Sequence, residues 1–167
     1  MNLNNYIRDI PDFPKKGIIF KDITPLLKNK DAYNYTIEEF KKRIITKKID
    51  YIIGIESRGF ILGAALAQTL NCGFVPIRKK GKLPYTVISQ TYDLEYGKDT
   101  LEVNLKLQAK KIIIVDDLLA TGGTAQAACE LLNNAGATVS CFISLIELDF
   151  LNGRKKIDVP IETLIRY

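Results

Sequence analysis

Short apolar runs alternate along the chain with stretches whose apolar residues recur at helical spacing. The runs are rich in isoleucine, valine and phenylalanine, as is typical of strands buried on both faces of a sheet. They occupy residues 51–56, 73–79, 110–117, 138–148 and 162–167. Between them, residues 57–71 and 125–135 favour helices, the second of which is closed by Gly136. This alternation predicts an α/β domain with a mainly parallel, twisted sheet flanked by helices.

The pattern is less regular near the N-terminus and in one central stretch. Residues 11–25 hold three of the six prolines, which predicts an irregular segment laid across another part of the fold. Residues 31–48 have the pattern of an amphipathic helix with Asp31 at its N-cap. Residues 87–104 alternate loosely and predict an exposed excursion of strands and loop. No linker divides the chain, so residues 1–167 are expected to form one domain.

Composition narrows the possible chemistry. The chain has 24 Lys and Arg against 19 Asp and Glu, and 47% of its residues are hydrophobic, which excludes a disordered protein. The net charge of +5 is compatible with an anionic partner and equally with an ordinary solvated surface. Histidine is absent, so zincin, Ser-His-Asp and Cys-His chemistries are excluded.

Cysteine usage and hydropathy indicate the compartment. Cys72, Cys129 and Cys141 are odd in number, lack a CxxC pairing and lie among apolar residues, which predicts buried free thiols in a reducing environment. The longest apolar stretch, residues 60–67, is too short for a membrane span, and the N-terminus lacks the pattern of a signal peptide. We therefore expect a cytoplasmic protein without a membrane partner.

A run of acids, glycines and hydroxyls begins at the end of the strand predicted at residues 110–117. Asp116 and Asp117 are the last two residues of that strand, and a glycine-bearing turn then leads into a helix. That turn consists of Ala120, Thr121, Gly122, Gly123 and Thr124. Glycines allow close backbone approach, and a helix N-terminus offers unpaired N–H groups, so the turn suits a phosphate monoester. The two acids suit sugar hydroxyls or a magnesium ion on the same ligand, although an acid pair followed by a simple helix-capping turn is the plainer alternative.

The segment VDDLLATGGT, residues 115–124, is similar to the phosphoribosyl-pyrophosphate motif of the type I phosphoribosyltransferases. Four further segments resemble the members of that family that act on adenine, so the resemblance covers essentially the whole chain. They are PDFPKKGIIFKDITPLL at residues 11–27, IESRGF at 55–60, IRKKGKLP at 77–84 and YDLEYGKD at 92–99.

The resemblance implies the type I phosphoribosyltransferase fold, with residues 1–30 as a hood over the base site and residues 31–167 as the core. It implies that adenine and phosphoribosyl pyrophosphate react to give AMP and pyrophosphate, with magnesium, in a homodimer. Magnesium would arrive with the substrate, with Asp116 and Asp117 as its possible protein ligands.

The resemblance also assigns residues to the substrate's parts. The 5′-phosphate would be bound by residues 120–124 and the ribose hydroxyls by Asp116 and Asp117. The pyrophosphate would be bound by Ser57, Arg58, Gly59, Arg78, Lys79 and Lys82. The adenine would be bound by Ile19, Phe20, Lys21 and Leu118. In the loop that closes over the site, Glu95 would accept the adenine N9 proton and Tyr96 would shape the closed loop. The resemblance further implies a cis peptide between Glu56 and Ser57.

Plainer interpretations remain for several of these residues. Arg58 could be a surface side chain, the basic run from Arg78 a solvated loop, Phe20 ordinary core and Glu95 part of a simple turn. Residues 154–156 match no functional segment and are predicted to be surface.

Lys21 stands where many relatives carry arginine, which leaves its backbone groups as the ones to read the base. Two rival functions also remain: a nucleotide-responsive regulator that binds nucleic acid, and a transferase for another base. The absence of an added DNA-binding domain and the presence of Glu95 argue against the first, so no nucleic-acid partner is expected. The motif LLATGGT and the hood argue against hypoxanthine, guanine and orotate as the substrate base.

Overall fold

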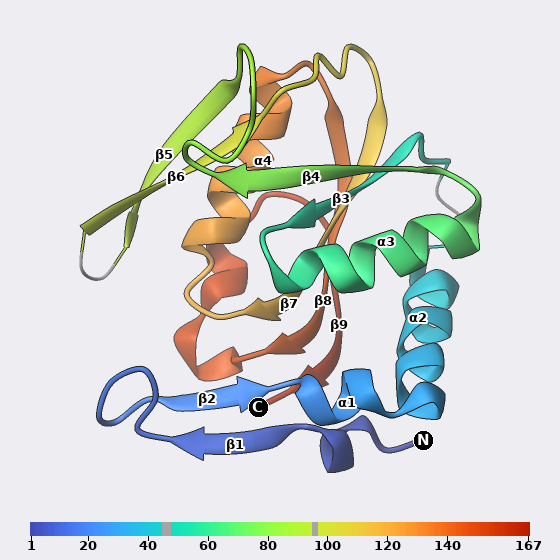
Figure 1. Ribbon diagram of the computed structural model, residues 1–167, viewed down its shortest axis with the longest axis vertical. Helices are drawn as coiled ribbons and strands as arrows, with labels where there is room; N and C mark the ends of the chain where they lie inside the picture. Colours follow the sequence, from blue (N-terminus) through green and yellow to red (C-terminus); the bar gives the residue numbers. More distant parts are fainter. Residues whose placement is uncertain (45–47, 95–96) are drawn as a thin grey trace.

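In the computed structural model, which describes residues 1–44, 48–94 and 97–167, seven strands form one sheet in the order β5-β6-β4-β3-β7-β8-β9 (Figure 1). The parallel strands are β3 (Tyr51–Ile55), β4 (Gly73–Lys79), β7 (Lys111–Leu119), β8 (Thr138–Glu147) and β9 (Ile161–Arg166). An antiparallel hairpin of β5 (Ile88–Leu94) and β6 (Gly97–Val103) extends one edge. The predicted α/β class with a mainly parallel sheet is confirmed.

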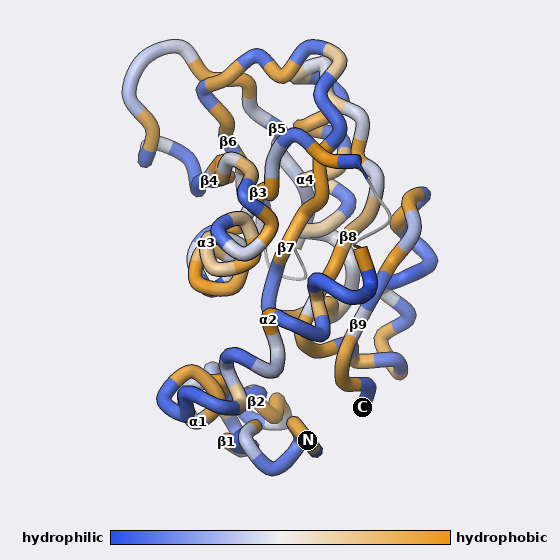
Figure 2. The backbone as a smooth tube through the Cα atoms, turned by 90° about the vertical axis from the view of Figure 1, so that its right-hand side faces the viewer, coloured by the Kyte–Doolittle hydropathy of each residue, from blue (hydrophilic) through white to orange (hydrophobic). Residues whose placement is uncertain are grey.

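Helices cover both faces of the sheet, as the apolar runs predict. α2 (Lys30–Ile44) and α3 (Arg58–Leu70) pack with Ile52 and Ile113 on one face. α4 (Gly123–Asn134) packs with Ile53 and Ile112 on the other. Adjacent strand residues thus point into two different cores, so the run has to be apolar at every position. Figure 2 shows the hydrophobic stretch of β7 running through the middle of the molecule. No helix of the described residues is long and apolar enough to cross a bilayer.

The N-terminal segment is more regular than the prolines predict. After a short 3-10 turn, η1 (Leu3–Tyr6), strands β1 (Arg8–Pro11) and β2 (Ile19–Asp22) pair as an antiparallel hairpin, which leads into α1 (Thr24–Lys28). The prediction of an irregular segment was wrong because Pro11 ends an edge strand, where it needs no ladder N–H, and the other prolines lie outside the two strands. In Figures 1 and 2 this segment forms a separate layer at the carboxyl ends of β7, β8 and β9.

Three predicted boundaries move. Asn29, not Asp31, caps α2, because the Asn29 Oδ1 accepts the N–H groups of Asp31 (3.1 Å) and Ala32 (2.9 Å). α4 begins at Gly123 rather than at residue 125. β7 continues beyond its predicted end at Asp117 to Leu119, which pairs with the end of β8, so the acid pair lies inside the strand rather than at its last two positions.

The loop between β8 and β9 forms two 3-10 turns, η2 (Asp149–Leu151) and η3 (Gly153–Lys156), beside the end of β7. Among the thiols, Cys129 and Cys141 are buried, whereas Cys72 is only half-buried; none of the three forms a disulfide. Burial raises the pKa of Cys129 to about 11, so this thiol stays protonated and inert at neutral pH.

Gly54 in β3 offers a test of how closely α3 packs on the sheet. A methyl group at Gly54 would lie 2.8 Å from the Gly59 carbonyl oxygen and 2.7 Å from the Phe74 ring. A methyl group at Gly63 would meet the same ring at 2.9 Å but no backbone atom closer than 3.5 Å. We therefore expect Gly54→Ala to lower the free energy of unfolding by about 1–3 kcal/mol.

Gly63→Ala is the matched control. Its methyl group would meet the same Phe74 ring, but alanine also stabilises the helix by about 1 kcal/mol relative to glycine. Urea denaturation of both variants measures the difference. Equal midpoints for the two would show that the Gly59 carbonyl does not limit the approach of α3.

Candidate active site

The sheet changes its direction of winding between β3 and β7. From β3 the chain passes through α3 to β4 on one side, and from β7 it passes through α4 to β8 on the other. In open α/β sheets, ligands bind outside the carboxyl ends of the strands at such a point. Residues 57–59 follow β3, and residues 116–124 end β7 and enter α4. The structure therefore brings two of the predicted groups to the expected place.

The two strand ends meet at Gly59. A Cβ atom there would lie 2.6 Å from the Val115 carbonyl oxygen and 3.1 Å from Asp116 Oδ1, so only glycine lets the loop after β3 come this close. The peptide between Glu56 and Ser57, at the start of this loop, is cis, which confirms the prediction. Ser57 is exposed, and Gly59 is buried against β7.

Residues 120–124, the phosphate loop, connect β7 to α4. Gly122 precedes α4 with φ of 83°, a conformation that favours glycine, and no side chain caps the helix there. The first amides of α4 are therefore not engaged by a capping side chain, and the helix dipole favours an anion at this end. A loop of this shape can bind a phosphate group.

The acid pair is short of hydrogen-bond donors. Asp117 is 4% exposed, and its Oδ2 has no hydrogen-bond partner among the described residues. Arg58 Nε lies 3.0 Å from that oxygen, but its N–H is not directed at it, so the contact is an ion pair only. Asp116 Oδ1 accepts the neighbouring Asp117 N–H, at 2.9 Å. Buried acceptors in this state would gain from ligand hydroxyl groups.

Burial also raises the pKa values of both acids. Desolvation and the adjacent Asp117 carboxylate raise the pKa of Asp116 well above its usual range. Desolvation raises the pKa of Asp117 too, against the opposing charge of Arg58. Perturbed carboxyl groups at the end of a strand are typical of functional sites.

Arg58 connects the acid pair to the N-terminal hairpin. Its guanidinium carbon lies 5.0 Å from the centre of the Phe20 ring, and the Phe13 ring packs edge-on against Phe20 at 5.2 Å. Arg58 is thus held between Phe20 and Asp117, so the alternatives of a plain surface arginine and a plain core phenylalanine do not apply.

The other residues predicted for the base are arranged differently. Ile19 is 55% exposed on the hairpin and Leu118 is half-buried at the end of β7. The Lys21 ammonium pairs with Asp9 at 2.8 Å and lies 3.6 Å above the Tyr167 ring. Neighbouring strand residues point to opposite sides, so Phe20 faces Arg58 while the Lys21 side chain is engaged elsewhere.

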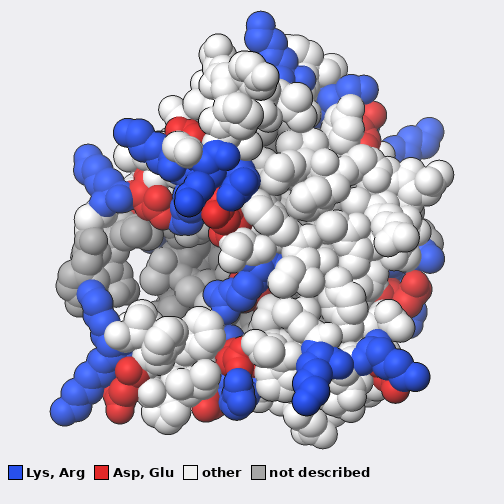
Figure 3. Space-filling view, in the orientation of Figure 1, with Lys and Arg blue, Asp and Glu red and all other residues white. Residues whose placement is uncertain are grey.

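The basic run from Arg78 divides between the two faces of the sheet. Arg78 Nε donates to Glu56 Oε2 at 3.1 Å, beside the loop of residues 57–59, and this hydrogen bond lowers the pKa of Glu56. Lys79 instead pairs with Asp99 on β6 and donates to the Tyr92 hydroxyl at 3.1 Å. Lys82 is exposed. Figure 3 shows lysines and arginines interspersed with acids on the side of the molecule that carries the β5–β6 hairpin.

Tyr92 of β5, which the sequence analysis did not single out, connects the β5–β6 hairpin to the phosphate loop. Its hydroxyl accepts from Thr124 Oγ1 at 3.3 Å as well as from Lys79. The structure thus brings Lys79 to the phosphate loop, not to the loop of residues 57–59. Glu95 and Tyr96, farther along the same hairpin, lie outside the described residues.

Arg154 corrects the prediction that residues 154–156 are only surface. Its Nε and Nη2 donate to the two oxygens of buried Glu147, at 2.9 and 2.5 Å. The one available signal was that the apolar run of β8, like that of β7, contains an acid near its end. Nothing in the sequence shows which cation meets it.

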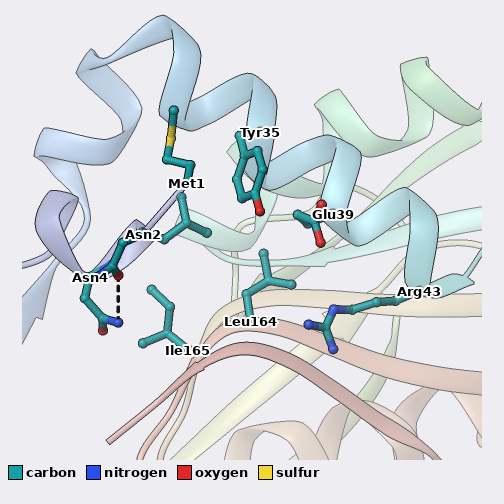
Figure 4. A pocket seen from close by; sticks show the side chains of 9 residues that line it. Met1, Asn2, Asn4, Tyr35, Glu39, Arg43, Leu164 and Ile165 are labelled. Carbon is teal, nitrogen blue, oxygen red and sulfur yellow. Dashed lines mark hydrogen bonds between the residues drawn. The ribbon is translucent and has the colours of Figure 1, made fainter.

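A separate cavity of about 180 Å³ lies between the N-terminal residues, α2 and β9 (Figure 4). It contains none of the predicted site residues. Asn2 Oδ1, at its rim, already accepts from the Asn4 backbone N–H and from Asn4 Nδ2, both at 3.1 Å, and so is committed to the 3-10 turn.

Comparison with known proteins gives consistent matches. Residues 23–162 match the phosphoribosyl transferase domain family. The adenine phosphoribosyltransferase of Brachyspira hyodysenteriae is 54% identical over 170 positions, covering 100% of both chains. The crystal structure of adenine phosphoribosyltransferase from Thermoanaerobacter pseudethanolicus has a TM-score of 0.96 at 51% identity, over 99% of this chain and 98% of that one.

A third match is a crystal structure with bound small molecules. The Saccharomyces cerevisiae adenine phosphoribosyltransferase, in complex with adenine and an imino-altritol bisphosphate, has a TM-score of 0.90 at 42% identity. It covers 95% of this chain and 94% of its own. The fold predicted from the motifs is the fold of these proteins.

The raised pKa of Asp116 predicts that this carboxylate destabilises the free protein. The folded state holds the proton more tightly than the unfolded chain does. Stability therefore falls as pH rises from about 4, the unfolded value, through the raised pKa. Asp116→Asn keeps the acceptor for the Asp117 N–H and removes the charge. We expect it to raise Tm at pH 7.5 by about 2–4 °C, the shift for ~1 kcal/mol in a chain of this size.

Thermal unfolding between pH 4 and pH 8 measures this effect, and the gain should shrink toward pH 4. Glu38→Gln, at an exposed carboxylate, is the control and should leave Tm unchanged. A lower Tm for Asp116→Asn at pH 7.5 would contradict the prediction that the charge of Asp116 destabilises the folded protein.

Proposed function

This chain belongs to the type I phosphoribosyltransferases, among the adenine phosphoribosyltransferases, and we propose that its substrates are adenine and phosphoribosyl pyrophosphate. The products are AMP and pyrophosphate. In this reaction the bond from ribose C1 to the pyrophosphate oxygen breaks and a bond from C1 to adenine N9 forms, while N9 loses its proton.

One arrangement carries this proposal: Phe20, Arg58 and Asp117 follow one another in contact and lead to the phosphate loop. The ring and guanidinium are 5.0 Å apart, and the guanidinium Nε lies 3.0 Å from Asp117 Oδ2. An aromatic face, a cation, a buried acid pair and a helix N-terminus match, in order, a base, a leaving pyrophosphate, ribose hydroxyls and a 5′-phosphate.

The ribose and phosphate assignments follow from the polar groups that lack partners. We assign the ribose hydroxyls to Asp116 and to Asp117, whose buried Oδ2 has no donor among the described residues. The 5′-phosphate is assigned to the phosphate loop, from Ala120 to Thr124. Because the loop ends in the first turn of α4, the amides of Gly123 and Thr124 are available as donors.

The pyrophosphate side is assigned to Ser57, Arg58, Gly59, Arg78 and Lys82. Fixed cations lower the energy of charge that develops on a leaving group. Lys79, also predicted there, is held by Asp99 and Tyr92, so we place it next to the 5′-phosphate instead.

The acid pair is also where the structure best fits a magnesium ion. Among residues 1–44, 48–94 and 97–167, no three Asp, Glu or Cys side chains converge to hold a metal by themselves. Asp116 and Asp117 are hard oxygen donors with lone pairs to spare, which fits an ion that arrives with the substrate's phosphates. When bound, magnesium neutralises pyrophosphate charge. The residues of this chain bind and orient the sugar.

For the base, we assign one face to Phe20 and the opposite face to Leu118, with the backbone groups of Ile19 and Lys21 reading its edge. Adenine presents an amino donor beside a ring acceptor, and hypoxanthine reverses both. A site that pairs one pattern leaves the other unpaired. Residues 1–30 act in this proposal as a hood that covers the base.

Two further features belong to the proposal. The face over α3 carries few charges in Figure 3, and Ile61 of α3 is 43% exposed, which suits contact with a second copy in a homodimer. The three cysteines, none of which forms a disulfide, suit a cytoplasmic, reducing location.

The experiment that tests the function offers one base at a time. Adenine, hypoxanthine, guanine and orotate are each supplied with phosphoribosyl pyrophosphate and magnesium, and the nucleotide formed is measured. We expect AMP formation with adenine at a rate at least 10³-fold above that with any other base, in the range that mispaired buried polar groups impose. Equal rates with hypoxanthine, or no transfer to adenine, would contradict the proposal.

Glu95 is the proposed acceptor of the N9 proton, since the chain has no histidine and the two aspartates are assigned to the ribose. Glu95→Gln keeps the size and polarity of the side chain and removes its basicity. We expect kcat to fall by about 10²–10⁴-fold with KM values little changed. The neighbouring exposed Asp93→Asn is the matched control and should keep kcat within about twofold. A wild-type single-turnover rate for Glu95→Gln would show that the proton goes to solvent or to substrate phosphate.

A further inference from the structure

A buried ion pair lies behind the phosphate loop, outside the residues assigned to substrate. Glu147, at the end of β8, is 3% exposed. Its carboxylate accepts from Arg154 Nε and Nη2, at 2.9 and 2.5 Å, and from Thr163 Oγ1 at 3.0 Å, while Arg166 Nε lies 3.5 Å away. With its lone pairs occupied in this way, Glu147 is a fixed anchor rather than a group that waits for a ligand.

Arg154 uses the rest of its guanidinium to hold the turn that carries it. Nη1 donates to the Ile161 carbonyl oxygen at 3.1 Å, at the start of β9. One planar group thus joins η3 to the ends of two neighbouring strands. Because the guanidinium makes two hydrogen bonds to the Glu147 carboxylate and one to a carbonyl oxygen, its position and orientation are fixed as well as stabilised.

The turn held by Arg154 touches the phosphate loop. A Cβ atom at Gly153 would lie 2.1 Å from the Ala120 carbonyl oxygen and 2.8 Å from the Gly122 nitrogen. A Cβ atom at Gly122 would lie 2.3 Å from the Gly153 carbonyl oxygen. The two backbones are therefore packed against each other with no room for a side chain, and the phosphate loop cannot retreat on this side.

We propose that Arg154 is a positioning residue for the 5′-phosphate: through Glu147 it holds Gly153 against residues 120–122 and so fixes the direction of the phosphate-loop amides. This inference rests on the proposed function, because it needs that loop to bind the phosphate. Donors held in place before binding cost no reorganisation, whereas a shift of about 1 Å can cost 10²-fold. The atoms nearest to a Cβ at Gly153 belong to Ala120 and Gly122 and not to a residue assigned to the base, so we expect phosphate binding to depend on this contact more than base binding does.

The test separates phosphate binding from base binding. Arg154→Met removes the clamp, and Gly153→Ala displaces the phosphate loop without touching the ion pair. In both we expect the Kd of AMP and the KM of phosphoribosyl pyrophosphate to rise about 10–100-fold, with the KM of adenine within twofold of wild type. Arg154→Lys keeps the charge but not the fork, so its effect should be smaller and in the same direction. Lys155→Met, at the exposed neighbour, is the control and should behave as wild type.

Calorimetry with AMP and steady-state kinetics give these values, and thermal unfolding shows whether each variant is folded. If Arg154→Met does not fold, Arg154→Lys and Gly153→Ala still decide the question. Folded variants that bind AMP as wild type does, or that lose adenine and phosphoribosyl pyrophosphate in parallel, would overturn the positioning role. Failure of wild-type protein to bind AMP would instead overturn the proposed function.

Discussion

The close approach of two parallel strand ends is the constraint on which the site depends. At Gly59 the loop after β3 comes so near the end of β7 that a single methyl group would collide with the Val115 carbonyl. This contact places Arg58 beside Asp117, and Arg58 in turn meets Phe20 of the N-terminal hairpin. A cation, an acid pair and an aromatic face from three distant parts of the sequence thus converge because the sheet reverses its winding there.

Two neighbouring strands carry acids near their carboxyl ends, and the structure treats these acids in opposite ways. At the end of β8, burial tends to raise the pKa of Glu147, but the hydrogen bonds from Arg154 and Thr163 outweigh it and the pKa is lowered. Near the end of β7, desolvation raises the pKa values of Asp116 and Asp117, and Asp117 Oδ2 has no hydrogen-bond partner among the described residues. A satisfied acid supports the fold, and an unsatisfied one favours a ligand that brings donors. The first supports the phosphate loop that lies beside the second.

Much of this arrangement could be predicted from the sequence, because its signals are local. Apolar runs gave the strands, and the acid-glycine-threonine run after residue 115 gave the phosphate loop and its helix. The hairpin of residues 8–22 was missed because prolines dominate its composition while edge strands tolerate them. The partners of Arg154 and Lys79 could not be predicted for another reason. Which acid a cation meets is decided by tertiary packing and strand alternation, and a basic run looks the same whether it is solvated or paired.

In the proposed complex one nucleotide spans the reversal point of the sheet, and a crystal structure with bound AMP tests this most directly. We expect phosphate oxygens within hydrogen-bond distance of the amides of residues 121–124. We also expect the ribose hydroxyls on Asp116 and Asp117, and the base against Phe20. AMP bound elsewhere, such as in the cavity between residues 1–4 and α2, or bound here with its phosphate at Arg58 and its base at residues 120–124, would contradict it.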